Sequence, residues 1–285
     1  MTEIIERAEV ERILREPRYP VPEADASSTA PFDRFRARAS RFANGAVHDA
    51  RRRRLDAALT ALRPAELARL AGSRTRGALA RGADITRIAR SVPVAVLGEA
   101  LGFSDPDGLP PLVGQVTARY ASGTATDTAA EDAAITRLLA AAPARDDEAR
   151  VLLVQLLVQA HAATAALVEG AMRRLGASVH SAQTTRELLG ATLRDESPVP
   201  FTRRVAPDGT VLALRLDGPD ADADDRAVEP RTLAFGAGPR SCPAPHHALA
   251  IAGAIVDELR WGSPSSTASP TRPSNTLKAA HADAG

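Results

Sequence analysis

Residues 146–175 contain no proline, and no glycine before Gly170, and they are predicted to make a single helix. About thirty residues is far more than the usual length of a helix in a globular protein. Its apolar run, residues 151–168, approaches the length of a membrane span. The run carries polar side chains at Gln155, Gln159 and His161. They favour a helix buried inside a soluble protein, so the segment predicts a mainly helical fold around a long central helix.

Apolar periodicity and capping residues predict shorter helices on both sides of it. These helices cover residues 4–14, 32–43, 47–62, 64–80, 84–91, 93–101, 129–142, 182–194 and 248–259. Residues 210–216 alternate apolar and polar side chains and are the best strand candidate, and the acidic residues 217–225 are expected to be a surface loop. Residues 262–285 are rich in Ser, Pro, Thr and Ala, which predicts a disordered tail. The sequence therefore predicts one mainly α domain over residues 1–261 with little sheet.

Charge and cysteine content exclude several classes of protein. The formal net charge of +1 gives no global attraction to nucleic acid or to an anionic membrane. Cys242 is the only cysteine, so there is no internal disulfide framework and a reducing compartment is expected. The first residues lack a basic region followed by an apolar stretch, so no signal peptide is expected. The expected location is the cytoplasm, with neither a nucleic-acid nor a membrane partner.

The segment before the cysteine carries the strongest chemical signal. It reads Phe235-Gly-Ala-Gly-Pro-Arg-Ser-Cys242, and its glycines allow a tight loop that brings backbone N–H groups close to a ligand. A buried thiolate needs such donors, since an ion without hydrogen bonds is costly to bury. A helix starting shortly after Cys242 would point its positive end at the sulfur, and Arg240 adds a cation. A thiolate metal ligand is predicted, with an ordinary buried cysteine beside a turn as the alternative.

This string resembles the haem-ligand loop of the cytochrome P-450 family, F-G-x-G-x-[H/R]-x-C-x-G. Five positions match, namely Phe235, Gly236, Gly238, Arg240 and Cys242, whereas Ala244 replaces the last glycine. The resemblance implies haem b as the cofactor, with Cys242 as the axial ligand of its iron and with Phe235 and Gly236 beside it. It also implies a P-450-like helical fold with reduced β content, of the bacterial, actinobacterial kind.

Further stretches resemble the family in the right order, so that the likeness covers roughly residues 8–260. Residues 44–52 are similar to the helix D-x-P-x-H-x-x-x-R, whose His and Arg lie on one face and bind a haem propionate; these positions are His48 and Arg52 here. Arg204 matches a further propionate-binding arginine, in the strand after a segment that resembles E-x-L-R. The resemblance therefore implies a propionate-binding set of His48, Arg52, Arg204 and Arg240. Two of the four arginines at 51–54 are expected on a solvated basic face.

The departures from the family pattern concern oxygen activation. The long helix of the family carries [A/G]-G-x-[D/E]-T, whose acid and threonine deliver protons to bound oxygen. Those positions are Ala162 and Ala163 here. His161 and Thr164 are the candidate proton donors in their place, although a histidine on a long helix is more often structural. The sequence keeps the residues that hold haem and lacks the pair that activates dioxygen.

Other departures concern the scaffold. The glutamate of E-x-x-R is Ala191, which leaves Arg194 without its usual partner. The N-terminal sheet, the meander before the cysteine loop and the C-terminal hairpin are expected to be shortened or missing. The chain thus resembles a truncated and divergent member of the family.

Functions from two classes stay open, beside an inactive remnant. One is a haem-thiolate oxidoreductase of the monooxygenase lineage, acting on a small organic substrate in secondary metabolism. It would take electrons from a ferredoxin-type partner, with impaired or altered oxygen activation. The other is a non-catalytic P-450-like helper that activates a glycosyltransferase; such proteins typically lack the cysteine. Cys242 and the propionate-binding set favour the first, whereas the alanines at 162, 163 and 191 favour the others.

Overall fold

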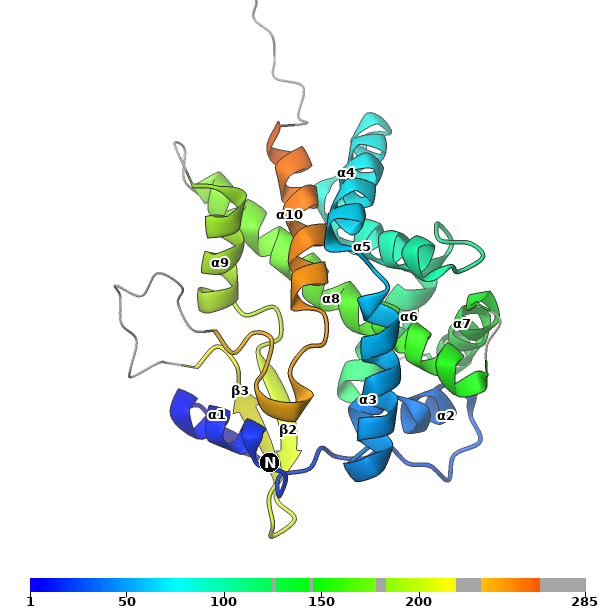
Figure 1. The fold of residues 1–285 in the computed structure, drawn as a ribbon, viewed down its shortest axis with the longest axis vertical. Coiled ribbons are helices and arrows are strands. Elements are labelled where there is room, and N and C mark those ends of the chain that lie inside the picture. Colours follow the sequence, from blue (N-terminus) through cyan, green and yellow to red (C-terminus); the bar gives the residue numbers. More distant parts are fainter. Residues whose placement is uncertain (125–126, 144–145, 178–182, 219–231, 262–285) are drawn as a thin grey trace, which may run out of the picture.

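The computed structural model describes residues 1–124, 127–143, 146–177, 183–218 and 232–261. These residues form ten α-helices, two 3₁₀ turns and three short strands, which confirms the predicted mainly α fold (Figure 1). The helices are α1 (Arg7–Arg15), α2 (Pro31–Arg38), α3 (Gly45–Thr60), α4 (Pro64–Ala80), α5 (Ile85–Leu101), α6 (Leu109–Ser122), α7 (Thr128–Ala141), α8 (Asp147–Ala177), α9 (Thr185–Asp195) and α10 (Pro245–Trp261). The predicted tail and most of the predicted acidic loop lie outside the described residues.

The long helix α8 crosses the middle of the molecule, behind α10 in Figure 1. It contacts α5, α6, α9 and α10. By length and composition it could span a membrane, but 67% of its most apolar 18-residue window is buried inside the structure. Val154, Leu157 and Val168 have no exposed surface, or almost none. The prediction of a long buried helix is therefore confirmed.

Helix α5 differs from its prediction, because residues 84–91 and 93–101 form one helix with Pro93 inside it. Proline removes one backbone hydrogen bond and crowds the preceding turn. The segment around Pro93 is buried almost completely and packs on α8, so burial of apolar surface outweighs that loss. The predicted ends are confirmed: Asp84 accepts the Arg87 N–H at 2.7 Å, and Gly102 closes the helix with φ +82°.

Helix α6 was not predicted from the sequence. Pro110 and Pro111 lie in its first turn, where proline is tolerated, but in the sequence they suggest a turn. Its buried face includes Leu109, Val113 and Tyr120. The predicted first helix also needs correction: Thr2–Ile4 is strand β1, and α1 begins only at Arg7.

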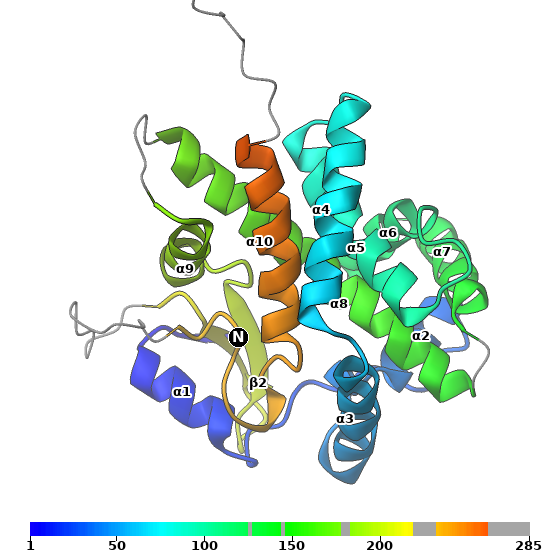
Figure 2. The same ribbon diagram turned by 45° about the horizontal axis from the view of Figure 1, so that its top comes forward.

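The sheet has the order β1–β3–β2, with β2 (Phe201–Val205) antiparallel and β1 parallel to β3 (Val211–Arg215). Strand β3 confirms the predicted strand at 210–216. The sheet and α1, which lie side by side in Figure 2, pack on a small core separate from the main one. This core also contains Leu233 and Ala237 from the segment before Cys242. The sheet and α1 therefore support that segment.

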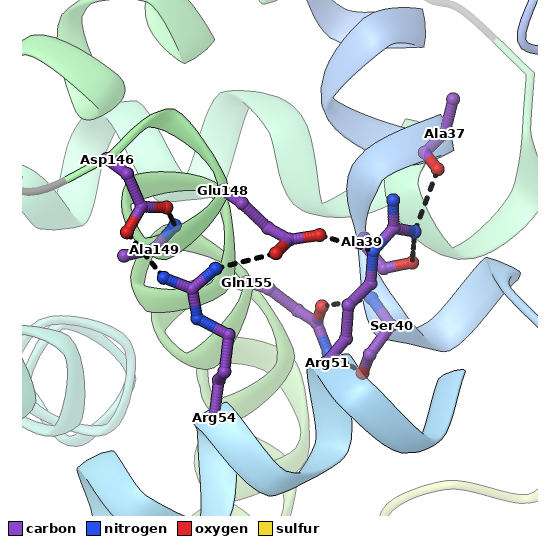
Figure 3. A network of polar contacts seen from close by, with 9 residues as sticks. All are labelled: Ala37, Ala39, Ser40, Arg51, Arg54, Asp146, Glu148, Ala149 and Gln155. Carbon is purple, nitrogen blue, oxygen red and sulfur yellow. Dashed lines mark hydrogen bonds and ion pairs between the residues drawn. The ribbon is translucent and has the colours of Figure 1, made fainter. Parts of the chain in front are cut away.

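Polar contacts fix α3 and the 3₁₀ turn η1 (Ser40–Phe42) to the start of α8 (Figure 3). Arg54 on α3 pairs with Asp146 at 2.5 Å and with Glu148 at 2.6 Å. Gln155, which is 2% exposed, accepts the Ser40 N–H at 2.7 Å and donates to Ser40 Oγ at 3.0 Å. The buried amide of α8 thus fixes η1, and with it the position of the following residue, Arg41.

Candidate functional site

The cysteine loop, residues 233–244, leads from the sheet into α10. The N–H of Cys242 donates to the carbonyl of Phe235 at 2.7 Å, which closes the loop on itself. Gly236 and Gly238 have φ values of +69° and +67°, which glycine adopts without strain. The Ala244 N–H lies 3.4 Å from Cys242 Sγ and donates to it. The predicted tight loop with a backbone donor for the sulfur is therefore present.

Gly238 is required by its contact with α1. A Cβ atom there would lie 2.8 Å from the carbonyl oxygen of Leu14 and 2.9 Å from Cα of Arg15. Both are backbone atoms, so neither can turn away. The loop thus rests directly on α1.

Gly238→Ala is expected to lower the free energy of unfolding by about 2 to 4 kcal/mol, because the left-handed conformation and the backbone clash add. Urea unfolding followed by circular dichroism measures this loss. Gly209→Ala is the matched control, because Gly209 has φ +85° but no atom within 4 Å of its would-be Cβ. It is expected to lose only about 1 kcal/mol. Equal losses in the two variants would contradict the importance of the contact with α1.

Burial raises the pKa of the Cys242 thiol, while the Ala244 N–H and the Arg52 guanidinium act in the opposite direction. Arg52 is the cation that acts on the sulfur. Arg240, which the sequence placed near the sulfur, instead donates to Ala43 O at 2.5 Å and to Asn44 Oδ1 at 2.9 Å. The thiol is neutral at pH 7 unless a metal ion replaces its proton.

Helix α3 brings His48 and Arg52 to the cysteine loop. Arg52 Nη1 donates to the carbonyl of Ser241 at 2.7 Å, and its Nε pairs with Asp56 at 2.8 Å. His48 is 7% exposed, with Nδ1 3.0 Å from Asp49 Oδ1. Burial lowers the pKa of His48, and the cations Arg240 and Arg52 lower it further. His48 and Arg52 lie on one face of α3, as their spacing predicts. Both are near Arg240, whose charge acts on His48.

Arg204 on β2 is the most unusual charge at this site. It is 4% exposed and donates only to Arg203 O at 2.8 Å and to Thr202 Oγ1 at 3.4 Å. Burial, together with the cations Arg240 and Arg41, lowers its pKa to about 10. Among the described residues no carboxylate lies within ion-pair distance of it. A buried cation with like charges beside it indicates a binding site for an anion.

Arg41 belongs to this group, and sequence reasoning missed it. It lies in η1, just before the segment that resembles the propionate-binding helix, and no motif marks it. Its charge acts on Arg204 of β2, which is far from it in the sequence. The structure thus groups His48, Arg52, Arg204 and Arg240 with Arg41 and the cysteine loop. Haem would supply two carboxylates, the chemistry that Arg204 lacks, so this donor set fits haem.

Within the part of the chain that the structure describes, no hydrogen bond joins His161 or Thr164 to this group. Gly170 of α8 faces α9, where a Cβ would meet Thr192 at 2.5 Å. His161 precedes Gly170 by nine residues, two and a half turns, and so lies on the opposite face of α8. Its Nδ1 is 3.3 Å from Thr117 Oγ1 of α6, and it lines a groove of about 1550 Å³ beside α4, α5 and α6. Thr164 is 4% exposed.

Two other departures from the family pattern have a structural outcome. Ala162, which is exposed, and Ala163, which is partly buried, have only methyl side chains on α8 and therefore no proton to transfer. Arg194 pairs with the adjacent Asp195 at 3.1 Å, and its side chain is 44% exposed. It is a surface arginine, as expected from the loss of its partner at Ala191.

The comparisons with known proteins place the fold. A scan against protein-family models finds no match, and neither does a search of curated proteins. Solved structures do match. P450BioI, in complex with an acyl carrier protein ligated to hexadec-9Z-enoic acid, has 18% identity and a TM-score of 0.75 over 92% of this chain and 85% of its own. CalO2 has 18% identity and a TM-score of 0.74 over 90% of this chain and 82% of its own. CYP109E1 from Bacillus megaterium, in complex with testosterone, has 16% identity and a TM-score of 0.72 over 92% of this chain and 86% of its own. At this level of identity the likeness shows the fold alone.

Proposed function

We propose that this chain, which has the fold of the cytochromes P-450, binds haem b through Cys242 and works as a haem-thiolate oxidoreductase of the monooxygenase lineage. The observation that carries the proposal is that Arg204 is buried near Arg240 of the cysteine loop and forms no ion pair with a carboxylate among the described residues. Among the described residues, no three His, Cys, Asp or Glu side chains lie close enough to hold a bare metal ion. A metal at Cys242 therefore needs a carrier with its own donors and with carboxylates for the arginines, and haem has both.

Each residue has a defined task in this proposal. Cys242 supplies the axial sulfur, and the Ala244 N–H and Arg52 stabilise its negative charge. Arg204 and Arg240, with His48 and Arg52, hold the propionates. Phe235 and Gly236 shape the loop, Phe235 by accepting the Cys242 N–H. When bound, haem supplies the redox and oxygen chemistry, tuned by its thiolate ligand.

The substrate is proposed to be a small organic molecule of secondary metabolism, the electron donor a ferredoxin-type protein, and the location the cytoplasm. Oxygen activation is proposed to be impaired or altered, because Ala162 and Ala163 replace the proton-delivering pair. His161, whose Nδ1 lies 3.3 Å from Thr117 Oγ1, and the buried Thr164 are the candidate proton donors in their place. Peroxide released per electron supplied measures this, and Ala163→Thr combined with Ala162→Asp is expected to reduce it.

The test of haem binding is a titration of the purified chain with haem, followed by the absorption spectrum of the reduced carbon monoxide complex. One haem per chain and a thiolate-type spectrum are expected. Arg52→Leu is expected to weaken retention at least tenfold, because a carboxylate loses its charged partner. Arg53→Leu is the matched control, since Arg53 is exposed on the same helix. A wild-type chain that takes up no haem would refute the proposal.

A non-catalytic helper that activates a glycosyltransferase is the second candidate, with an inactive remnant as the third. The surface position of Arg194 and the alanines of α8 favour them. Co-expression with a transferase distinguishes the helper from the enzyme. A helper is expected to raise the amount of soluble transferase even when Cys242 is replaced by alanine, whereas an oxidoreductase is not.

A further inference from the structure

Arg41 also belongs to a second group of polar side chains. The other members are Arg36 of α2 and Tyr120 of α6. The guanidinium carbon of Arg41 is 5.9 Å from the ring centres of both Tyr120 and Phe42. Arg36 lies over the ring of Phe42 at 4.4 Å, and the rings of Phe42 and Tyr120 meet edge to face at 5.1 Å. Two arginines thus share one aromatic ring beside a buried phenol.

Two polar atoms in this group have no hydrogen-bond partner among the residues that the structure describes. Tyr120 is 3% exposed, and its hydroxyl makes no hydrogen bond; the buried Nε of Arg36 makes none either. Burial raises the pKa of Tyr120 and lowers the pKa of Arg36, so the phenol keeps its proton and the guanidinium is poorly solvated. An unsatisfied buried donor lowers stability by about 1 to 3 kcal/mol. Both atoms are donors, and both call for an acceptor.

Two carboxylates of this region already form ion pairs with another arginine, Arg119. Asp33 pairs with Arg119 at 2.8 Å, and Glu131 pairs with the same arginine at 3.0 Å. Within the described ranges, neither Arg36 nor Arg41 has a carboxylate at ion-pair distance. The hydrogen bonds of Gln155 to Ser40 hold the turn that carries Arg41. Asp33 acts on the charge of Arg36 only from beyond ion-pair distance. Among the described residues, the site is therefore cationic and has no carboxylate in direct contact with Arg36 or Arg41.

We propose that Arg36, Arg41 and Tyr120 bind the carboxylate of a small organic acid, with Phe42 against its apolar part. Guanidinium groups match a carboxylate in shape and charge, and the phenol adds a third donor. The inference rests on the proposed function, because it takes this acid to be the substrate of the oxidoreductase. It narrows the substrate class to carboxylic acids.

A haem propionate is the other source of a carboxylate here, since Arg41 also acts on Arg204. The test therefore uses both the haem-free and the haem-loaded chain. Each is titrated calorimetrically with 3-phenylpropanoate and octanoate, and with the matching uncharged alcohols. Both forms are expected to bind an acid and not its alcohol.

Arg41→Gln and Tyr120→Phe are each expected to weaken acid binding by about tenfold to 100-fold. This is the usual contribution of one hydrogen bond to a charged group. Arg38→Gln, on the exposed side of α2, is expected to leave it unchanged. Tyr120→Phe removes a hydroxyl without a partner, so its thermal midpoint is expected to stay equal or rise. Lost binding in that variant is then not caused by unfolding.

Binding that disappears when haem is loaded would assign the cluster to a propionate and overturn the inference, as would equal binding of acid and alcohol. A chain that binds haem but neither acid would overturn it while leaving the proposed function intact. A chain that binds an acid but never haem would refute the oxidoreductase and support the carboxylate site.

Discussion

Replacing Cys242 by alanine is expected to abolish the thiolate-type spectrum of the reduced carbon monoxide complex completely. The chain contains no other cysteine, so no second thiolate can take over. Haem affinity is expected to fall at least tenfold, the effect of losing roughly 1.4 kcal/mol or more of ligation. The haem-free fold is expected to lose only about 1 kcal/mol, because the sulfur makes a single hydrogen bond at 3.4 Å.

Ser241→Ala is the matched control for this variant. It changes a neighbouring side chain but keeps the Ser241 carbonyl that accepts the Arg52 hydrogen bond. Its spectrum is expected to equal that of the wild type. A thiolate-type spectrum that survives in Cys242→Ala would show that the iron ligand is not this residue.

Replacing Arg204 by leucine is expected to have opposite effects on stability and on haem retention. Burial, together with the cations Arg240 and Arg41, lowers the pKa of Arg204 to about 10, a penalty of about 3 kcal/mol against the charged form in the haem-free fold. Removing that charge is therefore expected to raise the free energy of unfolding of the haem-free chain by about 1 to 3 kcal/mol. The same change is expected to weaken haem retention at least tenfold, since a propionate loses its charged partner.

The sign of the pH dependence follows from the lowered pKa. Above pH 10 the folded state binds fewer protons than the unfolded state, so the penalty of burying Arg204 declines as the pH rises through this value. Between pH 6 and 9 the penalty is complete, and the difference between variant and wild type is expected to be constant. Urea unfolding at several pH values measures it, with Arg53→Leu as the control. A less stable haem-free Arg204→Leu would contradict the view that this arginine lacks an anion.

Local signals predicted the elements that depend on local interactions. Helix α8, the Asp84 cap, the end of α5 at Gly102 and strand β3 follow from periodicity, capping and glycine conformation. The errors come from tertiary packing, which keeps Pro93 inside a helix, and from prolines that conceal the start of α6. Neither effect can be inferred from a single segment.

The same distinction applies to the site. The loop around Cys242 and the residues His48, Arg52, Arg204 and Arg240 were predicted through motifs, because their spacing is conserved in the pattern that they resemble. Arg41 was missed, because its electrostatic effect on Arg204 depends on the tertiary fold and no local motif marks it. The orientation of Arg240 was missed for a similar reason, since its partners Ala43 and Asn44 lie at the start of α3.

The contacts of the cysteine loop also determine when the site can form during synthesis. Arg52 and Ser241 are 189 positions apart, and Arg240 and Ala43 are 197 apart. Gly238 meets α1, near the start of the chain. Closing such long loops delays folding, because the chain loses conformational entropy before the contacts that stabilise the loop are made. A nascent chain that ends before residue 238 lacks the loop that carries Cys242, so under the proposed function haem capture has to wait until that loop has left the ribosome.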